Sequence, residues 1–197
     1  MPIDADAAKD SLSLWTNEEA RRFLSSARMS PCGPYWSLRL ATGLRTDELL
    51  ALRWEDIDWD SGAVSVWRML SHGWGWCGPE VIPTDQRRKI HVRVPDAVMT
   101  QLQAHRRAQR EVRLAAGPAW QEHSLVLTTS TGMPTSVRFL TRELGRIIEQ
   151  ADVPRVPASA LLRMDALAPI SDEEHRFAAD AIEKVLFGAH PRRSPAT

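Results

Sequence analysis

The chain has 197 residues, 43 % hydrophobic and 25 % charged, which suits one globular domain with a sizeable core. No apolar run is long enough to cross a bilayer, and the N-terminus lacks the apolar stretch of a secretion signal, so we expect a cytoplasmic protein without a membrane partner. The formal net charge is zero, which excludes a uniformly basic surface but not segregated basic patches. Cys32 and Cys77 have no metal-site spacing, and we predict no metal and no cofactor.

The first part of the chain predicts three helices. After a loose lead-in over residues 1–14, Thr16 begins a capping box and therefore a helix. A short buried helix over residues 35–41 ends at Gly43, because glycine suits the left-handed position that follows a helix. A third helix is predicted from about residue 46 to residue 52.

The middle of the chain predicts short strands and then two helices. The strands fall at residues 63–67, 81–82 and 90–94. A long helix begins at Asp96 and is closed by Gly117, and Ser136 caps another helix whose apolar residues keep helical spacing. Pro154 and Pro157 end that helix. The predicted fold class is α+β and mostly helical, with helices around a small antiparallel three-stranded sheet.

Residues 158–197 form a tail with one predicted helix over about residues 172–187. Ser171 begins a typical N-cap signature, and apolar residues follow at helical spacing. This tail could fold back over the core, or it could be a recombined end that only has a helical pattern. The sequence leaves both interpretations open.

Three motifs follow one another along the chain. ATGLRTDELLALRWEDID covers residues 41–58, the hairpin IPTDQRRKIHV covers residues 82–92, and LVLTTSTGMPTS covers residues 125–136. Their content and order resemble the catalytic domain of the tyrosine recombinases, the phage-integrase family, and the first motif carries most of the likeness. The resemblance implies a partial catalytic domain over residues 15–157, truncated or degenerate beyond that point. It also implies double-stranded DNA as a partner, with homologous recombinase subunits as further partners.

The resemblance gives Arg45 a role in binding phosphate. Enzymes of this family exchange phosphodiester bonds through a phosphotyrosine, and the transition state carries extra negative charge on its non-bridging oxygens. A guanidinium offers such oxygens a planar fork and stays charged at any working pH. The competing interpretation is an ordinary surface pair between Arg45 and Glu48, worth less than ~1 kcal/mol.

The family pattern fails at several catalytic positions. Pro83 stands where the hairpin lysine of the family is expected, and Ala160 stands at the histidine of the His-x-x-Arg motif, which leaves only Arg163. Tyr35 is the only tyrosine and precedes Arg45, whereas the nucleophile of the family follows every other catalytic group, so Tyr35 is expected to be a core aromatic. The catalytic candidates are therefore Arg45 and Arg163, and the chain alone is predicted to be inactive.

The basic residues of the middle region are the predicted DNA contacts. They are Arg87, Arg88, Lys89, Arg106, Arg107 and Arg110. For the first three, a solvated hairpin tip is an equally good interpretation. We favour a DNA-binding domain without strand exchange. The alternatives are a recombinase completed by a partner chain that supplies the tyrosine and histidine, and a protein-binding module that uses the tail helix and the tryptophan-rich loop.

Overall fold

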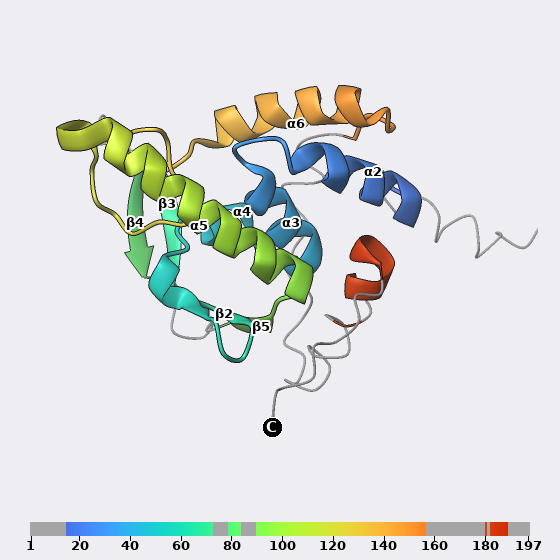
Figure 1. The fold of residues 1–197 in the computed structure, drawn as a ribbon, viewed down its shortest axis with the longest axis horizontal. Coiled ribbons are helices and arrows are strands. Elements are labelled where there is room, and N and C mark those ends of the chain that lie inside the picture. Colours follow the sequence, from blue (N-terminus) through green and yellow to red (C-terminus); the bar gives the residue numbers. More distant parts are fainter. Residues whose placement is uncertain (1–14, 73–78, 84–89, 157–179, 181, 189–197) are drawn as a thin grey trace, which may run out of the picture.

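The computed structural model describes most of the chain, and Figure 1 shows its arrangement. The described residues are 15–72, 79–83, 90–156, 180 and 182–188. The lead-in, most of the tail, and the predicted site residues Arg87, Arg88, Lys89 and Arg163 lie outside them. The helices within this part are α2 (Asn17–Ala27), α3 (Gly33–Thr42), α4 (Thr46–Leu50), α5 (Asp96–Ala116) and α6 (Val137–Ala151). None of the helices in the described ranges is long and apolar enough to span a membrane.

The predicted three-stranded antiparallel sheet is confirmed, although its strands differ from the predicted set. Strands β1 (Ile57–Asp58), β2 (Ala63–Val66) and β5 (Ile90–Arg93) form it in the order β1-β2-β5. Strands β3 (Arg68–His72) and β4 (Pro79–Pro83) form a separate two-stranded sheet, which takes up the strand predicted over residues 81–82. The sequence RMLSH of β3 contains no β-branched or aromatic residue, so its composition does not indicate a strand.

Helices α2 and α6 begin as predicted. The Thr16 hydroxyl accepts a hydrogen bond from the Glu19 backbone at 3.2 Å, and the Glu19 carboxylate accepts one from the Thr16 backbone at 2.7 Å. The Ser136 hydroxyl accepts a hydrogen bond from the Phe139 backbone at 3.2 Å. The two helices pack against each other, as Figure 1 shows at the top of the molecule. The Trp15 indole, just before α2, also donates to the Pro154 carbonyl, just after α6, at 3.0 Å. This bond joins the start of α2 to the segment that follows α6.

Helix α4 is shorter than predicted, because Leu52 lies outside the helix and its backbone bonds another segment. It ends at Leu50, and the Leu52 carbonyl accepts a hydrogen bond from the Val126 backbone at 2.9 Å. Leu49 and Leu52 are both buried, as the helix pattern predicts. The apolar segment 125–127 is buried beside them. This contact ties the first arginine motif to the third motif.

Helix α5 is buried at its beginning and exposed at its end. Its buried residues are Val98, Met99 and Leu102, all in the first two turns, and the helix packs against α3. Leu114, near the end, is 81 % exposed. In Figure 1 the helix crosses in front of α3 and α4, and its C-terminal end reaches the edge of the molecule.

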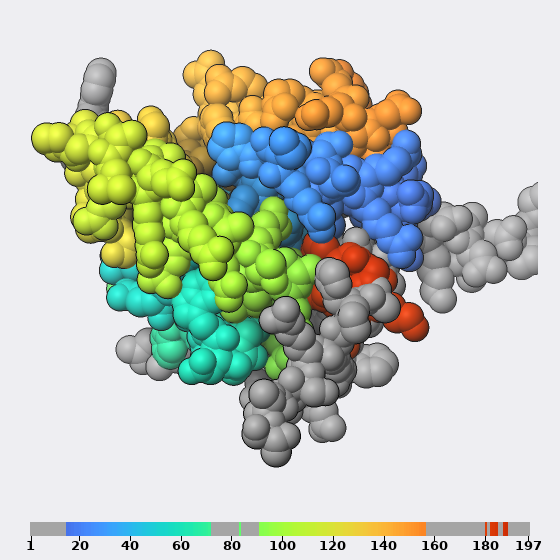
Figure 2. Space-filling view, viewed as in Figure 1, coloured from blue at the N-terminus to red at the C-terminus, as the bar shows by residue number. Residues whose placement is uncertain are grey.

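One described part of the tail returns to the core. The short π-helix η4 (Glu183–Phe187) contacts both α2 and α5, and Figure 2 shows it beside them. The Glu183 carboxylate accepts hydrogen bonds from the Ala97 backbone at 3.3 Å, at the first turn of α5. Residues 182–187 therefore fold back, which is one of the two arrangements that the sequence left open. The remainder of the helix predicted over residues 172–187, apart from Asp180, lies outside the described residues.

Candidate nucleic-acid interface

The turn between α3 and α4 is built by the residues that surround Arg45. Gly43 has a φ of 64°, in the left-handed region, and its backbone N–H caps α3 by bonding the Arg39 carbonyl at 3.0 Å. The Thr42 hydroxyl donates to the Leu38 carbonyl at 2.6 Å and accepts from the Leu44 backbone at 3.3 Å. The chain therefore leaves α3 with these backbone groups bonded, and Arg45 follows in extended geometry as the N-cap of α4.

Three buried polar side chains hold the same turn from inside. The fully buried Arg39 donates from Nη1 to the Leu44 carbonyl. The Glu48 carboxylate accepts from the Arg45 backbone at 2.7 Å, and the Tyr35 hydroxyl bonds the Thr46 hydroxyl at 3.0 Å. The direction in which Arg45 leaves the backbone is thus fixed by side chains on both helices. This is the preorganisation that a phosphate contact requires.

Arg45 itself reaches solvent. Its side chain is 41 % exposed, and its Nε lies 3.4 Å from the Asp47 carboxylate. The sequence suggested a side-chain pair with Glu48, but Glu48 is 3 % exposed and bonds the backbone of Arg45 instead. Within the described ranges, no acceptor is bonded to the two Nη groups of Arg45. Arg45 therefore has an exposed guanidinium whose Nη groups are not hydrogen-bonded to any described acceptor.

Arg39 is the site residue that sequence analysis did not identify. Its position in the apolar helix 35–41 is the only available signal, because an arginine with no exposed surface must find acceptors inside the protein. The predicted burial of Tyr35 is confirmed, with no exposed surface. Burial raises the pKa of the Tyr35 hydroxyl, an effect that its hydrogen bond with Thr46 partly offsets. Tyr35 therefore supports the turn from inside the core.

The arginines predicted to bind DNA on α5 lie on the exposed part of that helix. Arg107 and Arg110 are exposed. The half-buried Arg106 lies over two tryptophan rings, with its guanidinium carbon 5.5 Å from the Trp54 centroid and 5.7 Å from the Trp59 centroid. Such cation–π contacts orient a guanidinium without neutralising it. In the described part of the chain, no hydrogen bond or ion pair joins these arginines to Arg45, so they form a second basic region.

Gln109 and His105 fix the surface beneath this second region. The Gln109 side chain accepts from the Trp54 indole at 2.7 Å and donates to the Leu125 carbonyl at 3.1 Å. His105 Nε2 lies 2.8 Å from the Val126 carbonyl, and because a carbonyl only accepts, Nε2 carries the proton. Burial lowers the pKa of His105, which this hydrogen bond partly offsets. His105 is therefore neutral and structural.

The described residues contain no group of three or more histidine, cysteine, aspartate or glutamate side chains that could hold a metal ion. Cys32 is a buried free thiol whose Sγ lies 3.2 Å from the Ser30 hydroxyl, and burial raises its pKa. A buried thiol of raised pKa is a poor nucleophile. Among the described residues, the exposed arginines on α5 and at the turn of Arg45 are groups that can bind an anion.

Comparison with known proteins agrees with the motifs. No family model matches the chain. A tyrosine recombinase XerC-like protein of Caldanaerobacter subterraneus subsp. tengcongensis is 28 % identical over 151 residues, which cover 71 % of this chain and 39 % of that protein. An integrase of Streptomyces ambofaciens is 27 % identical over 146 residues, which cover 70 % of this chain and 36 % of that protein. The chain thus spans well under half the length of these curated relatives.

Solved structures share the fold. The Tn1549 transposon integrase in complex with transposon right end DNA matches with a TM-score of 0.59 and 16 % identity, over 98 % of this chain and 62 % of that one. The XerA recombinase matches with a TM-score of 0.56 and 14 % identity, over 76 % of this chain and 47 % of that one. The chain therefore resembles the tyrosine recombinases in both sequence and fold, as its first arginine motif predicts.

Proposed function

We propose that this chain is a DNA-binding relative of the tyrosine recombinases, and that Arg45 contacts a phosphate of the DNA backbone. The exposed guanidinium of Arg45, on a turn fixed by buried side chains, is the observation that carries this proposal. The two curated relatives are a recombinase and an integrase, and one structural neighbour is a complex with DNA, which supports the same function.

Physical chemistry favours a phosphate as the ligand of Arg45. The planar fork of arginine matches two phosphate oxygens, and an arginine fixed by its backbone loses little freedom when it binds. Asp47, at 3.4 Å, is a weak competitor because it bonds Nε at a long distance and leaves both Nη groups available. Arg106, Arg107 and Arg110, with the hairpin residues Arg87, Arg88 and Lys89, are proposed to add sequence-independent attraction to the duplex.

We infer that the chain alone does not break and rejoin DNA strands. Its only tyrosine is buried and bonded to Thr46, and no histidine stands three residues before Arg163. Four expectations from the sequence stay predictions. They are Arg163 as a second catalytic arginine, a partial domain bounded at residues 15–157, homologous recombinase subunits as partners, and a cytoplasmic location. A duplex with a nick near the cleavage point traps a covalent phosphotyrosine in active recombinases. We expect no trapped band, and a band that disappears in Tyr35→Phe would contradict the inference.

The test of DNA binding is a titration of a labelled duplex by fluorescence anisotropy at several salt concentrations. Parent affinity should fall with salt, with a slope of roughly −0.9 per neutralised phosphate. Arg45→Ala should weaken binding and reduce the size of the slope by about one unit. Arg21→Ala is the matched control, because Arg21 is 46 % exposed and lies 3.5 Å from Glu18.

Two results would overturn the proposal. The first is no binding of the parent protein even at low salt. The second is an Arg45→Ala variant whose affinity and slope equal those of Arg21→Ala, which would make Arg45 an ordinary surface arginine.

A further inference from the structure

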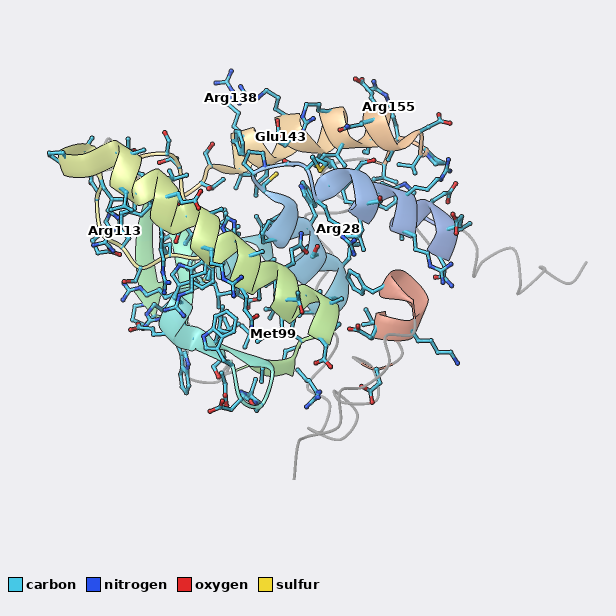
Figure 3. All side chains as sticks on the ribbon, in the orientation of Figure 1. Arg28, Met99, Arg113, Arg138, Glu143 and Arg155 are labelled. Carbon is cyan, nitrogen blue, oxygen red and sulfur yellow. The ribbon has the colours of Figure 1, made fainter. Side chains whose placement is uncertain are left out.

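A hollow of about 260 Å³ lies at the C-terminal half of α5, and none of its lining residues belongs to the turn of Arg45. The lining residues that matter here are Trp54, Arg106, Arg110, Arg113, Trp120 and Glu122. Arg113, labelled in Figure 3, comes from the end of α5 opposite Met99. The volume holds several waters, each about 30 Å³ in the liquid, but is smaller than the roughly 300–1,000 Å³ of pockets for drug-sized ligands. It fits a small anion with part of its hydration shell.

The charges around the hollow do not balance. Three arginines and one carboxylate, that of Glu122, line the hollow. The Glu122 carboxylate is already bonded to other groups. Glu122 lies 2.6 Å from Arg113 and accepts hydrogen bonds from the Ser124 backbone at 2.9 Å and the Trp120 indole at 3.3 Å. Burial raises the pKa of Glu122, but these partners outweigh it and the net shift is downward, so Glu122 stays ionised. Arg106 and Arg110 remain as two positive charges without a carboxylate partner among the described residues.

The two surplus arginines are arranged to act together. They are four residues apart on α5 and therefore share one face of the helix. Arg106 is positioned by the faces of Trp54 and Trp59, whose rings are stacked with centroids 6.3 Å apart, and Trp54 is fixed by its bond to Gln109. Because aromatic faces and not an acid hold the guanidinium, its N–H edges are left for a ligand.

We propose that this hollow binds a phosphate group through the guanidinium groups of Arg106 and Arg110. The phosphate comes from a free phosphate or phosphomonoester, or from the backbone of a nucleic acid. Binding of inorganic phosphate to the hollow can be measured without DNA, so the test of this site is separate from the test of DNA binding at Arg45. Arg107 lies between the two arginines in sequence but does not line the hollow, and it therefore serves as an internal control.

The experiment is an NMR titration of the full chain with inorganic phosphate, compared with chloride at matched ionic strength. The indole N–H signals of Trp54 and Trp120 report on the hollow, and Trp54→Phe and Trp120→Phe assign them. We expect phosphate to shift both signals with a saturating curve that chloride does not reproduce. Arg110→Ala should raise the apparent Kd about tenfold, as expected for one charge-assisted contact. Arg107→Ala should leave it unchanged.

The same two variants then identify the source of the phosphate. If Arg110→Ala also weakens duplex binding more than Arg107→Ala does, the hollow takes a backbone phosphate. If only the phosphate titration changes, it takes a free phosphate. Shifts that grow linearly without saturation, or an equal loss in Arg107→Ala and Arg110→Ala, would overturn the proposal, because both indicate general attraction of counter-ions. Absence of any duplex binding would contradict the proposed function and leave the phosphate result intact.

Discussion

At the scale of single residues, the turn of Arg45 shows how a buried charge can serve an exposed one. Arg39 has no exposed surface, yet its guanidinium supports the carbonyl of Leu44, the residue directly before Arg45. The motif ATGLRTDELL predicts the helix break from local rules for glycine and caps, and its resemblance to the recombinase motif singles out Arg45. It does not predict the bond from Arg39, since that bond depends on how α3 is oriented after packing.

Arg39→Met should therefore destabilise the protein more than a surface change does. Methionine fills similar space but leaves the Leu44 carbonyl buried without this donor, which costs about 1–3 kcal/mol. Urea unfolding measures the free energy of unfolding, and Arg22→Met, on the exposed face of α2, is the control. Arg45→Ala should change stability by less than ~1 kcal/mol, because a half-exposed ion pair is screened by solvent. Equal stability of Arg39→Met and the parent would show that the bond to Leu44 is dispensable.

At the scale of elements, periodicity predicted the helices well and the strands less well. The capping boxes and apolar spacing of α2 and α6 are local signals, and both helices start where those signals occur. The sequence does not predict β1, because it has only two residues, or β3, because it has no β-branched side chain. Each forms a strand because a partner strand bonds it. Helix α4 stops early for the same reason, since Leu52 is bonded by Val126.

The apolar face of α4 gives a test of the fold that is separate from function. Leu49→Ala should lower the free energy of unfolding by ~2–5 kcal/mol, because Leu49 has no exposed surface and its removal leaves a cavity. Leu114→Ala, at a leucine that is 81 % exposed, should change it by less than ~0.5 kcal/mol. Thermal or urea unfolding of both variants makes the comparison. A similar, small loss in each would mean that α4 is not packed as described.

His105 on α5 should make stability depend on pH. Its pKa is lowered from 6.5 by burial, so below about pH 6.5 the unfolded chain binds a proton more readily than the folded one. This contribution to stability is present above that pH and is lost as pH falls toward the folded-state pKa. His105→Gln should flatten the stability profile between pH 7 and 5, and His123→Gln, at an exposed position, should not. A profile of unchanged shape in His105→Gln would assign the dependence to other groups.

At the scale of the whole molecule, the tail takes part in the described core. Sequence patterns could not choose between a folded and an unrelated tail, because the contact of η4 with α2 and α5 joins residues far apart in the chain. The site is also only partly accessible to prediction. Arg45 was predicted from a motif, whereas the hollow on α5 combines side chains from three separate segments, and no local spacing in the sequence reports such a combination.

The contact of Glu183 with the Ala97 backbone predicts a local effect at the start of α5. No side chain of the N-cap residue, Pro95, caps this helix, so the distant carboxylate takes that place. Glu183→Gln should weaken the contact and cost about 0.5–2 kcal/mol, the usual range for loss of a cap. Hydrogen exchange at the Ala97 amide should become faster, while exchange in α6 stays the same. Unchanged exchange at Ala97 would show that the tail does not hold this helix end.

The pairing of α2 with α6 has a consequence for synthesis of the protein on the ribosome. Trp15 and Pro154, which are bonded in the fold, are 139 positions apart in the chain. At about 5–20 residues per second, translation takes roughly 7–28 s to make the second partner after the first. During that time α2 has no α6 to pack against. We therefore expect the nascent chain to be a substrate of ribosome-associated chaperones until α6 has emerged from the exit tunnel.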